Sequence, residues 1–454
     1  MDKTQKTDNR YEPRRPAGYL YHTLVPLAKL LSRILIKARF VRDPEIKKRK
    51  GPFVVVGTHS CYMDVAMMML AMYPVRLNIV CGRDVFTWKK IKPIKDAAGL
   101  IPINQFEIDL GSIRMMKRAV DNGLSLALFP EGKFTLDGKN MFYLPESLAK
   151  LLKLIGADVV FMHNYGGYCS KPRWYSGFKY GPVTNKSELL FTKEELKAKP
   201  VDEIYRVLEE KFSFNDPLYQ QENKLRFKSK HPALGIHYIL YKCPKCGTEY
   251  EMVSTDHHII CENCHNKVAF DEYGTFTPEN GSVTFPRIDL WYDFERESAR
   301  RELMKEDFSL SYPVVWAQND DENNYNDIGE GEFFMTREKM GFRGKRYSGE
   351  EASVEIPLFN QYTIVHKNYE AIDLTVDNRV NRFYFKDVKY SCKINVLVEE
   401  NFRLNHGLPC PAPVVLPEGS LIKREDAEET SSEPPEEISL SAKEAGESSE
   451  TPAE

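Results

Sequence analysis

This chain of 454 residues is poor in cysteine and has no long uncharged apolar run. Nine cysteines are too few for a disulfide scaffold, and four of them form two Cys-x-x-Cys pairs, which indicates a metal site in a reducing compartment. No run of about 18 uncharged apolar residues exists, so a transmembrane helix is not expected. The first 16 residues also lack the apolar core of a signal peptide. These absences predict a cytoplasmic protein whose membrane attachment is peripheral, on the inner face.

Net charge is also nearly absent, but the charges are segregated. Residues 1–50 contain 14 Lys and Arg against 5 Asp and Glu, whereas residues 425–454 contain 11 Asp and Glu against one Lys. The basic front end predicts attraction to an anionic surface, either membrane or nucleic acid. Because 42% of the residues are hydrophobic, the chain as a whole is not disordered. Its length predicts two or three domains.

Residues 17–45 are expected to form an amphipathic, membrane-associating helix after a flexible basic N-terminus at 1–16. Lys29, Arg33 and Lys37 recur every four residues and line one helical face, with leucine and isoleucine on the rest. Such a helix suits the plane of an anionic bilayer surface. Packing against its own domain is the alternative.

Residues 46–225 alternate short apolar runs with helical segments. The strand-like runs lie at 52–59, 77–82, 99–104, 124–132 and 156–164, and the helical segments at 65–73, 109–123 and 144–157. This alternation predicts an α/β domain with a mostly parallel sheet flanked by helices.

His59 ends the first of these runs, and Asp64 follows five residues later. In open α/β sheets, ligands bind at the carboxyl ends of the strands. Five residues place two side chains ~140° apart on a regular helix, so these two can meet only if the residues between them form a turn. A carboxylate on one imidazole nitrogen leaves the other as a base that activates a hydroxyl. The alternative is a histidine near a strand end and an unrelated helix-capping aspartate.

Four blocks in the chain resemble, in the same order, those of the glycerolipid acyltransferase family, which includes the 1-acyl-glycerol-3-phosphate acyltransferases. The blocks are THSCYMD (58–64), GLIPINQ (99–105), FPEGKFT (129–135) and ADVVFMH (157–163). The resemblance covers roughly residues 17–220. It implies that His59 removes the proton of an acceptor hydroxyl, with Asp64 holding His59, and that the hydroxyl attacks the thioester of acyl-CoA or acyl-carrier protein directly. Ser60 and Cys61 then need not be nucleophiles.

The sequence departs from the family pattern at three places. The arginines of the second and third blocks are Gln105 and Phe134 here, and the proline of the fourth is Phe161. Arginine suits a phosphate because of its fork geometry, so the acceptor is open: a lysophospholipid such as 1-acyl-sn-glycerol-3-phosphate, a glycolipid or another amphipathic alcohol. The substrate-binding candidates are Glu131, Gly132, Lys133, Arg83 and Gln105.

A zinc ribbon is predicted at 238–272. The pairs Cys243/Cys246 and Cys261/Cys264 are 14 residues apart and supply four thiolates for one structural Zn²⁺. A redox pair would need only one Cys-x-x-Cys. Because the surrounding residues are not strongly basic, nucleic acid is not an expected partner.

Residues 280–410 are expected to form a β-rich domain, which closes with an amphipathic helix at 389–404 and precedes a disordered acidic tail at 411–454. Residues 327–405, several strands and then a helix, faintly resemble the GRAM and pleckstrin-homology (PH)-like family. That resemblance implies an accessory module that binds lipid or protein. Packing against the catalytic half is the alternative.

Together these features predict a peripheral-membrane O-acyltransferase of phospholipid biosynthesis or remodelling. Its expected partners are a membrane lipid acceptor, an acyl-CoA or acyl-carrier protein donor and an anionic membrane surface. Two rival functions are a non-catalytic lipid-binding scaffold and a zinc-ribbon adaptor that binds protein or nucleic acid.

Overall fold

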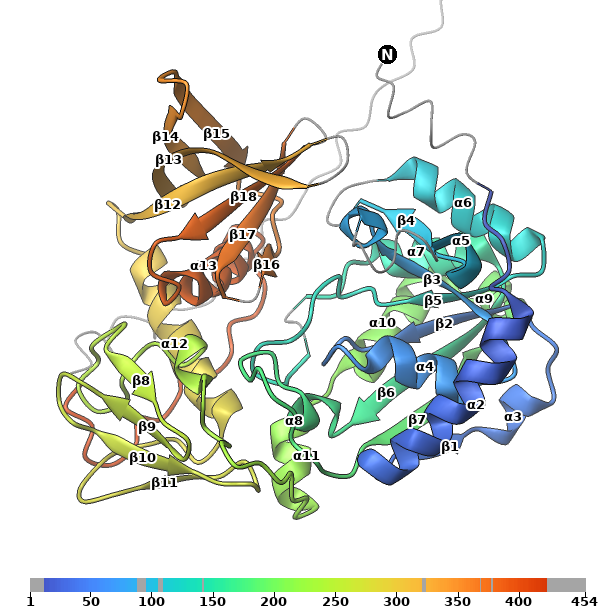
Figure 1. The fold of residues 1–454 in the computed structure, drawn as a ribbon, viewed down its shortest axis with the longest axis horizontal. Coiled ribbons are helices and arrows are strands. Elements are labelled where there is room, and N and C mark those ends of the chain that lie inside the picture. Colours follow the sequence, from blue (N-terminus) through green and yellow to red (C-terminus); the bar gives the residue numbers. More distant parts are fainter. Residues whose placement is uncertain are drawn as a thin grey trace, which may run out of the picture.

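The computed structural model describes residues 12–87, 95–104, 109–140, 143–320, 324–367, 369–376 and 379–422. An α/β part, a small four-stranded part and a seven-stranded antiparallel part follow one another along the chain (Figure 1). The expected basic N-terminus and acidic tail fall largely on residues 1–11 and 423–454, which lie outside the described residues, as does Gln105.

The α/β part is built on a seven-stranded sheet in the order β1-β7-β6-β2-β5-β3-β4. Its strands are β1 (Arg39–Arg42), β2 (Phe53–Gly57), β3 (Leu77–Gly82), β4 (Ile101–Ile103), β5 (Ser125–Leu128), β6 (Asp158–Tyr165) and β7 (Thr184–Phe191). Strands β6, β2, β5, β3 and β4 run parallel to one another, whereas β7 is antiparallel to β6 and parallel to β1. The expected mostly parallel sheet is therefore present.

Helices cover both faces of this sheet because its central strand is apolar on both sides. Val54 and Val56 pack against one helical layer, and Phe53 and Val55 pack against the other. The first layer comprises α6 (Leu110–Asp121), α7 (Ser147–Ile155), α9 (Lys193–Ala198) and α10 (Val201–Phe212). The second layer comprises α3 (Pro44–Lys47) and α4 (Asp64–Met72), with α2 (Gly18–Leu35) packed outside α4. Among the described residues up to 240, the remaining helices are the short α5 (Lys95–Ala98), α8 (Gly167–Ser170), α11 (Asp216–Glu222), η1 (Arg83–Thr87) and η2 (Ile236–Tyr238).

The cysteine pairs lie in a four-stranded antiparallel sheet of order β11-β10-β9-β8. Its strands are β8 (Met252–Ser254), β9 (His258–Cys261), β10 (Lys267–Phe270) and β11 (Phe276–Pro278). This small sheet runs past residue 272, the expected end of the ribbon.

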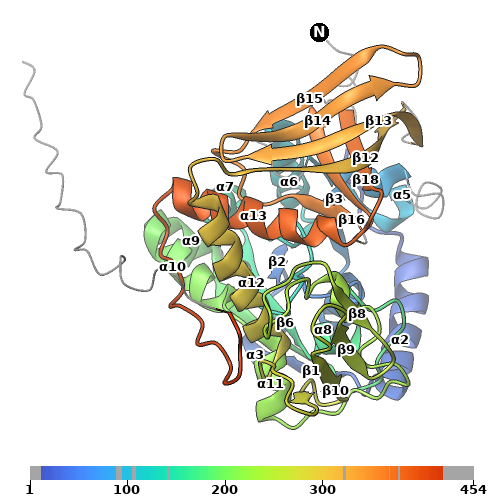
Figure 2. The same cartoon turned by 90° about the vertical axis from the view of Figure 1, so that its left-hand side faces the viewer.

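The last part is a seven-stranded antiparallel sheet of order β15-β14-β13-β12-β18-β17-β16. Its strands are β12 (Ser309–Asn319), β13 (Tyr325–Thr336), β14 (Lys339–Arg346), β15 (Glu351–Pro357), β16 (Val365–Lys367), β17 (Ala371–Val376) and β18 (Arg379–Phe385). Helix α12 (Ile288–Leu303) precedes the sheet, and α13 (Tyr390–Asn405) follows it. Figure 2 shows these two helices crossing beneath the sheet.

Two expectations about helices require correction. The first helix ends at Leu35 rather than 45, because residues 39–42 form β1 and pair with the edge strand β7. The C-terminal helix α13 is present but not amphipathic: residues 391–403 are all buried, because its polar side chains pair with α12 and with the α/β part. The sequence reasoning also missed α12, which places a 16-residue helix inside the expected β-rich region.

Both ends of the described chain are attached to the body. Near the N-terminus, Arg15 donates to the carbonyl of Gly123. Beyond residue 411, the Val414 amide donates to Glu297 and the Leu421 amide donates to the carbonyl of Lys245. Residues on the outer side of the expected boundaries at 16 and 411 thus make hydrogen bonds to the body of the protein.

Candidate active site

His59 and Asp64 meet at the end of the central strand. β2 ends at Gly57, the next residues form a turn, and Asp64 is the first residue of α4. His59 Nδ1 lies 3.3 Å from Asp64 Oδ2. A carboxylate at this position accepts a hydrogen bond from Nδ1–H. The lone pair of His59 then lies on Nε2, where it can take a proton from a hydroxyl. The turn that the sequence spacing required is present.

Asp64 is fully buried and is held by several donors. Its Oδ2 accepts from the amides of Ser60 (2.6 Å) and Cys61 (2.7 Å), and its Oδ1 accepts from Asn164 Nδ2 (2.8 Å). Asn185 in turn donates to Asn164. Sequence reasoning missed both asparagines, which lie 100 or more residues from Asp64 on β6 and β7. Asn164 is a polar residue at the end of the apolar run of β6, which is a weak signal, whereas Asn185 near the start of the polar strand β7 has none.

The Phe129–Thr135 loop holds His59 from the other side. Glu131 is buried and accepts the His59 amide at 2.6 Å, and the Thr135 amide donates to the His59 carbonyl. The rings of Phe129 and Phe134 lie 4.3 and 4.0 Å from the imidazole centre. Glu131, expected to shape the acceptor pocket, thus contacts the backbone of His59, while these rings restrain the imidazole plane.

Cys61 does not have the properties of a nucleophile. It is buried, and both its amide and its thiol face Asp64. Burial raises the pKa of the Cys61 thiol well above its usual range, and the nearby Asp64 carboxylate raises it further. A neutral thiol is a poor nucleophile.

A second histidine lies behind the pair without facing the cavity described below. His163 Nδ1 lies 2.6 Å from Thr58 Oγ1, and its Nε2 lies 3.1 Å from Asp216 Oδ1. All three residues are at most 3% exposed, so substrate has no access to them. Their bonds connect β2, β6 and α11 beneath His59.

His59 opens into a cavity of about 1510 Å³ that spans the α/β part and the C-terminal sheet. Gly132 and Phe134 line it near His59, α2 contributes Leu24 and Val25, and the C-terminal sheet contributes another wall. Cavities of about 300–1,000 Å³ hold most small ligands. This cavity therefore has room for ligands with long alkyl chains.

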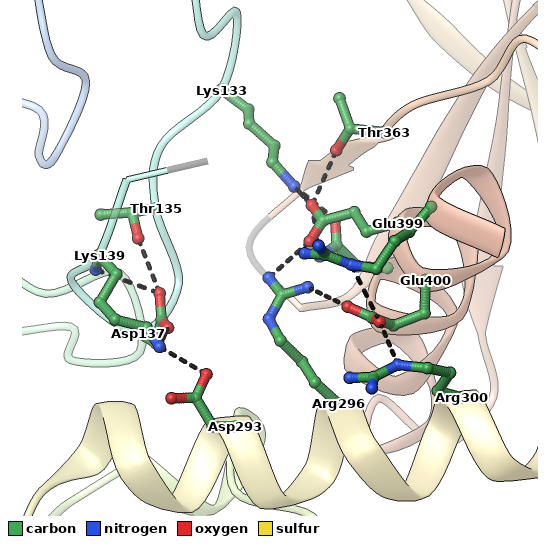
Figure 3. A network of polar contacts seen from close by, with 12 residues as sticks. Lys133, Thr135, Asp137, Lys139, Asp293, Arg296, Arg300, Thr363, Glu399 and Glu400 are labelled. Atoms are coloured by element: carbon green, nitrogen blue, oxygen red, sulfur yellow. Dashed lines mark hydrogen bonds and ion pairs between the residues drawn. The ribbon is translucent and has the colours of Figure 1, made fainter. Parts of the chain in front are cut away.

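The cations expected to replace the family's arginines are engaged elsewhere. Lys133 forms an ion pair with Glu399 of α13 (Figure 3). It also donates to Asn395 on the same helix at 2.9 Å. Burial lowers the pKa of Lys133, although Glu399 acts in the opposite direction. Arg83 donates to Asn104 at 2.6 Å. Sequence reasoning missed a third cation, Arg173, which lines the cavity.

The four cysteines of the two pairs have the arrangement of a metal centre. The sulfurs of Cys243, Cys246, Cys261 and Cys264 all lie within 4.8 Å of one another. Cys243 and Cys264 are 3.7 Å apart, and Cys246 and Cys261 are 3.8 Å apart. Tetrahedral zinc with Zn–S bonds of about 2.3 Å requires sulfur separations of about 3.8 Å. The residues therefore fit Zn²⁺.

Helix α2 carries an exposed apolar face. Tyr21 and Val25 are buried against α4, whereas Leu27, Leu30 and Ile34 are 54%, 55% and 67% exposed. Lys29, expected on a basic outer stripe, points inward and donates to the carbonyl of Leu70. Among the described residues, no helix is long and apolar enough to cross a membrane.

Comparison with known proteins identifies the first of the three parts. Residues 38–159 match the family model described as Acyltransferase. No curated protein matches the chain in sequence. One similar solved structure is the 1-acyl-sn-glycerophosphate acyltransferase PlsC of Thermotoga maritima, with 16% identity, a TM-score of 0.36, and coverage of 50% of this chain and 86% of that one. Residues 38–159 of the chain thus form a domain that matches the Acyltransferase family model.

Proposed function

We propose that this protein transfers a fatty acyl group from acyl-CoA or acyl-carrier protein to the hydroxyl of a lysophospholipid such as 1-acyl-sn-glycerol-3-phosphate. The observation that carries the proposal is the hydrogen-bonded His59–Asp64 pair at the wall of a large cavity inside an acyltransferase domain. His59, Asp64 and the loop that contains Gly132 form the catalytic centre.

The geometry supports a direct transfer without an acyl-enzyme. His59 Nε2 takes the proton of the acceptor hydroxyl, and the oxygen attacks the thioester carbonyl. The C–S bond then breaks, and the thiolate leaves with the proton that His59 received. The products are an ester and a free thiol, and the ionised Asp64 stabilises the imidazolium between the two proton transfers.

Release of free thiol from a long-chain acyl-CoA tests the proposal, with lysolipid acceptors and mass spectrometry of the product. Wild type should release thiol in an acceptor-dependent manner, and His59→Ala should lose about 100- to 10,000-fold of the rate. The matched control is His257→Ala, an exposed histidine that does not line the cavity. If no acceptor supports release with either acyl-CoA or acyl-carrier protein, the chain is a lipid-binding scaffold instead.

The protein is proposed to act on the inner face of a membrane, attached peripherally through α2. The exposed leucines and isoleucine of that helix continue into Leu24 and Val25 at the cavity wall, which supports a route for lipid from the bilayer. Lys37, Arg39 and their basic neighbours lie close in sequence to this apolar face.

Sedimentation with vesicles that contain phosphatidylglycerol tests the attachment. The double variant Leu27→Glu/Ile34→Glu should remain in the supernatant while wild type sediments, because two charges are added to the apolar face. Val415→Glu is the control, since Val415 is 85% exposed in the C-terminal segment. Equal sedimentation of the double variant would refute attachment through α2.

The C-terminal sheet and α13 are proposed to form a GRAM- or PH-like accessory module, and the ribbon a structural element. The order of a seven-stranded antiparallel sheet followed by one helix supports the GRAM- or PH-like assignment. The ribbon shares one hydrophobic core with α12 and that sheet, which favours a structural role over an adaptor for other molecules.

A further inference from the structure

The third motif block has lost its arginine, but a guanidinium from another segment lies beside that position. Phe134 stands where the family pattern has arginine, and its ring lies 4.0 Å from the His59 ring. Arg173, from the loop after α8, places its Cζ 5.7 Å from the centre of the same Phe134 ring. The sum of these two distances places Arg173 Cζ at most about 10 Å from the centre of the imidazole ring.

Arg173 is incompletely bonded. Its Nη2 donates to the main-chain carbonyl of His366, and its Nε is buried with no hydrogen-bond partner. Within the described part of the chain it has no carboxylate partner, although it lines the cavity. A buried N–H without an acceptor is costly, and such groups are rare unless a ligand or water completes them.

The other basic side chains of this wall differ from Arg173. Lys133 is neutralised by Glu399, and Arg382 forms a two-point ion pair with Asp373. His366 is neutral, because burial lowers its pKa well below the usual range and the charge of Arg173 lowers it further. Of the residues that the structure describes, the acidic ones that line this wall, Asp109 and Glu370, make no ion pair with Arg173. Within that part of the chain no carboxylate balances the charge of Arg173 close to His59.

From this arrangement we infer that Arg173 binds the anionic group of the acyl acceptor, a phosphate monoester, and so replaces the motif arginine from a different segment. The inference rests on the proposed function and specifies its substrate class. In 1-acyl-sn-glycerol-3-phosphate the free hydroxyl and the phosphate are on adjacent carbons, so the hydroxyl reaches His59 while the phosphate reaches Arg173, with hydrogen bonds of about 3 Å at each end. The guanidinium fork provides paired donors to phosphate oxygens.

Binding and turnover are measured separately. Binding uses the His59→Ala protein, which does not consume ligand, with 1-lauroyl-sn-glycerol-3-phosphate and with uncharged 1-lauroylglycerol as probes. Adding Arg173→Gln should weaken binding of the phosphate-bearing probe about 10- to 100-fold, as expected for the loss of charged hydrogen bonds. The affinity for the uncharged probe should change by no more than about twofold. Arg173→Lys should retain part of the affinity, because it keeps the charge without the fork.

In turnover, Arg173→Gln should raise KM for the phosphate-bearing acceptor far more than it lowers kcat. Arg206→Gln, an exposed arginine paired with Asp202, is the matched control. Unchanged affinity in Arg173→Gln, or equal loss for both probes, would overturn the inference. If wild type binds the anionic probe through Arg173 but transfers no acyl group, the proposed function fails and this inference stands. If the protein transfers acyl groups but Arg173→Gln does not change KM for the phosphate-bearing acceptor, the proposed function stands and this inference fails.

Discussion

At position 64 a single carboxylate organises the turn, the start of α4 and the imidazole of His59. It accepts two backbone amides, the side-chain amide of Asn164 and the ring nitrogen of His59. These hydrogen bonds hold the buried carboxylate in a fixed position beside the imidazole. Asp64 therefore supports the local structure and, under the proposed function, catalysis as well.

Replacement of this carboxylate should affect both properties. In Asp64→Asn an amide group faces donors that it cannot satisfy, so the free energy of unfolding should fall by about 1–3 kcal/mol. The rate of acyl transfer should fall about 100- to 10,000-fold because the imidazole loses its partner. Urea denaturation and thiol release measure the two effects. Asp121→Asn, an exposed residue paired with Lys117, should change neither, and an active Asp64→Asn enzyme would contradict the assignment.

Lys179 is a buried cation whose titration should be visible in stability. Burial lowers the pKa of Lys179 to about 7, and its ammonium lies 4.1 Å from the ring centre of Trp174. An unfolded lysine has a pKa of about 10.4, so between pH 7 and 10 the unfolded chain binds a proton that the native protein lacks. The free energy of unfolding should therefore rise with pH across this window, by up to about 1.4 kcal/mol per pH unit.

Lys179→Met should lack this rise. Urea denaturation measures the free energy of unfolding of the variant and of wild type at each pH. The value for the variant should exceed that of wild type most at pH 7, and the difference should disappear towards pH 10. The exposed Lys197→Met serves as control. Parallel pH profiles of Lys179→Met and wild type would show that Lys179 keeps an ordinary pKa.

At the scale of elements, the positions of strands and helix starts could be predicted from the sequence, whereas the burial of a helix by its neighbours could not. β2 to β6 match the expected apolar runs, and the Thr192 capping box begins α9 before Pro200 interrupts the helical stretch. Both follow from residues close in sequence. The burial of α13 on all sides depends instead on α12 and on Lys133, which are distant in the chain.

The cysteine cluster gives a prediction at this scale. The purified protein should contain about one zinc per chain, and Cys246→Ser should lose it. The thermal midpoint should then fall by at least about 5 °C, because a structural metal contributes several kcal/mol to folding. Cys410→Ser, at an exposed cysteine outside the cluster, should keep both zinc and midpoint. Wild-type protein without zinc would refute the assignment.

At the scale of the whole molecule, a buried ionic network joins the Phe129–Thr135 loop to the C-terminal part. Glu399 on α13 pairs with Lys133 and with Arg296 of α12, while Glu400 pairs with Arg296 and Arg300 (Figure 3). Burial alone raises the pKa of Glu399, but Lys133 and Arg296 outweigh burial and lower it to about 2. Glu399 is thus ionised at neutral pH and ties the two parts together behind the cavity.

Glu399→Gln should leave Lys133 and Arg296 without their carboxylate in the interior. The free energy of unfolding should fall by about 3–5 kcal/mol, as for other buried pairs that lose one partner. The double variant Lys133→Met/Glu399→Gln should recover part of the loss, since one uncompensated charge is removed. Urea denaturation of both variants and of the exposed control Glu338→Gln provides the measurement. No destabilisation in Glu399→Gln would mean that the network contributes little.

The sequence by itself determined the features that depend on neighbouring residues: the strand ending at His59, the turn to Asp64, the order of the motif blocks and the spacing of the four cysteines. Only the tertiary structure decided which distant groups complete them. Asn164 reaches Asp64 from another strand, and Lys133, at the cavity wall, pairs with Glu399 of α13. Arg173 comes to the place of the missing arginine through a loop that no local pattern marks. The physical reason is that a side chain's partners are set by packing between elements, whereas periodicity and spacing report only on the element itself.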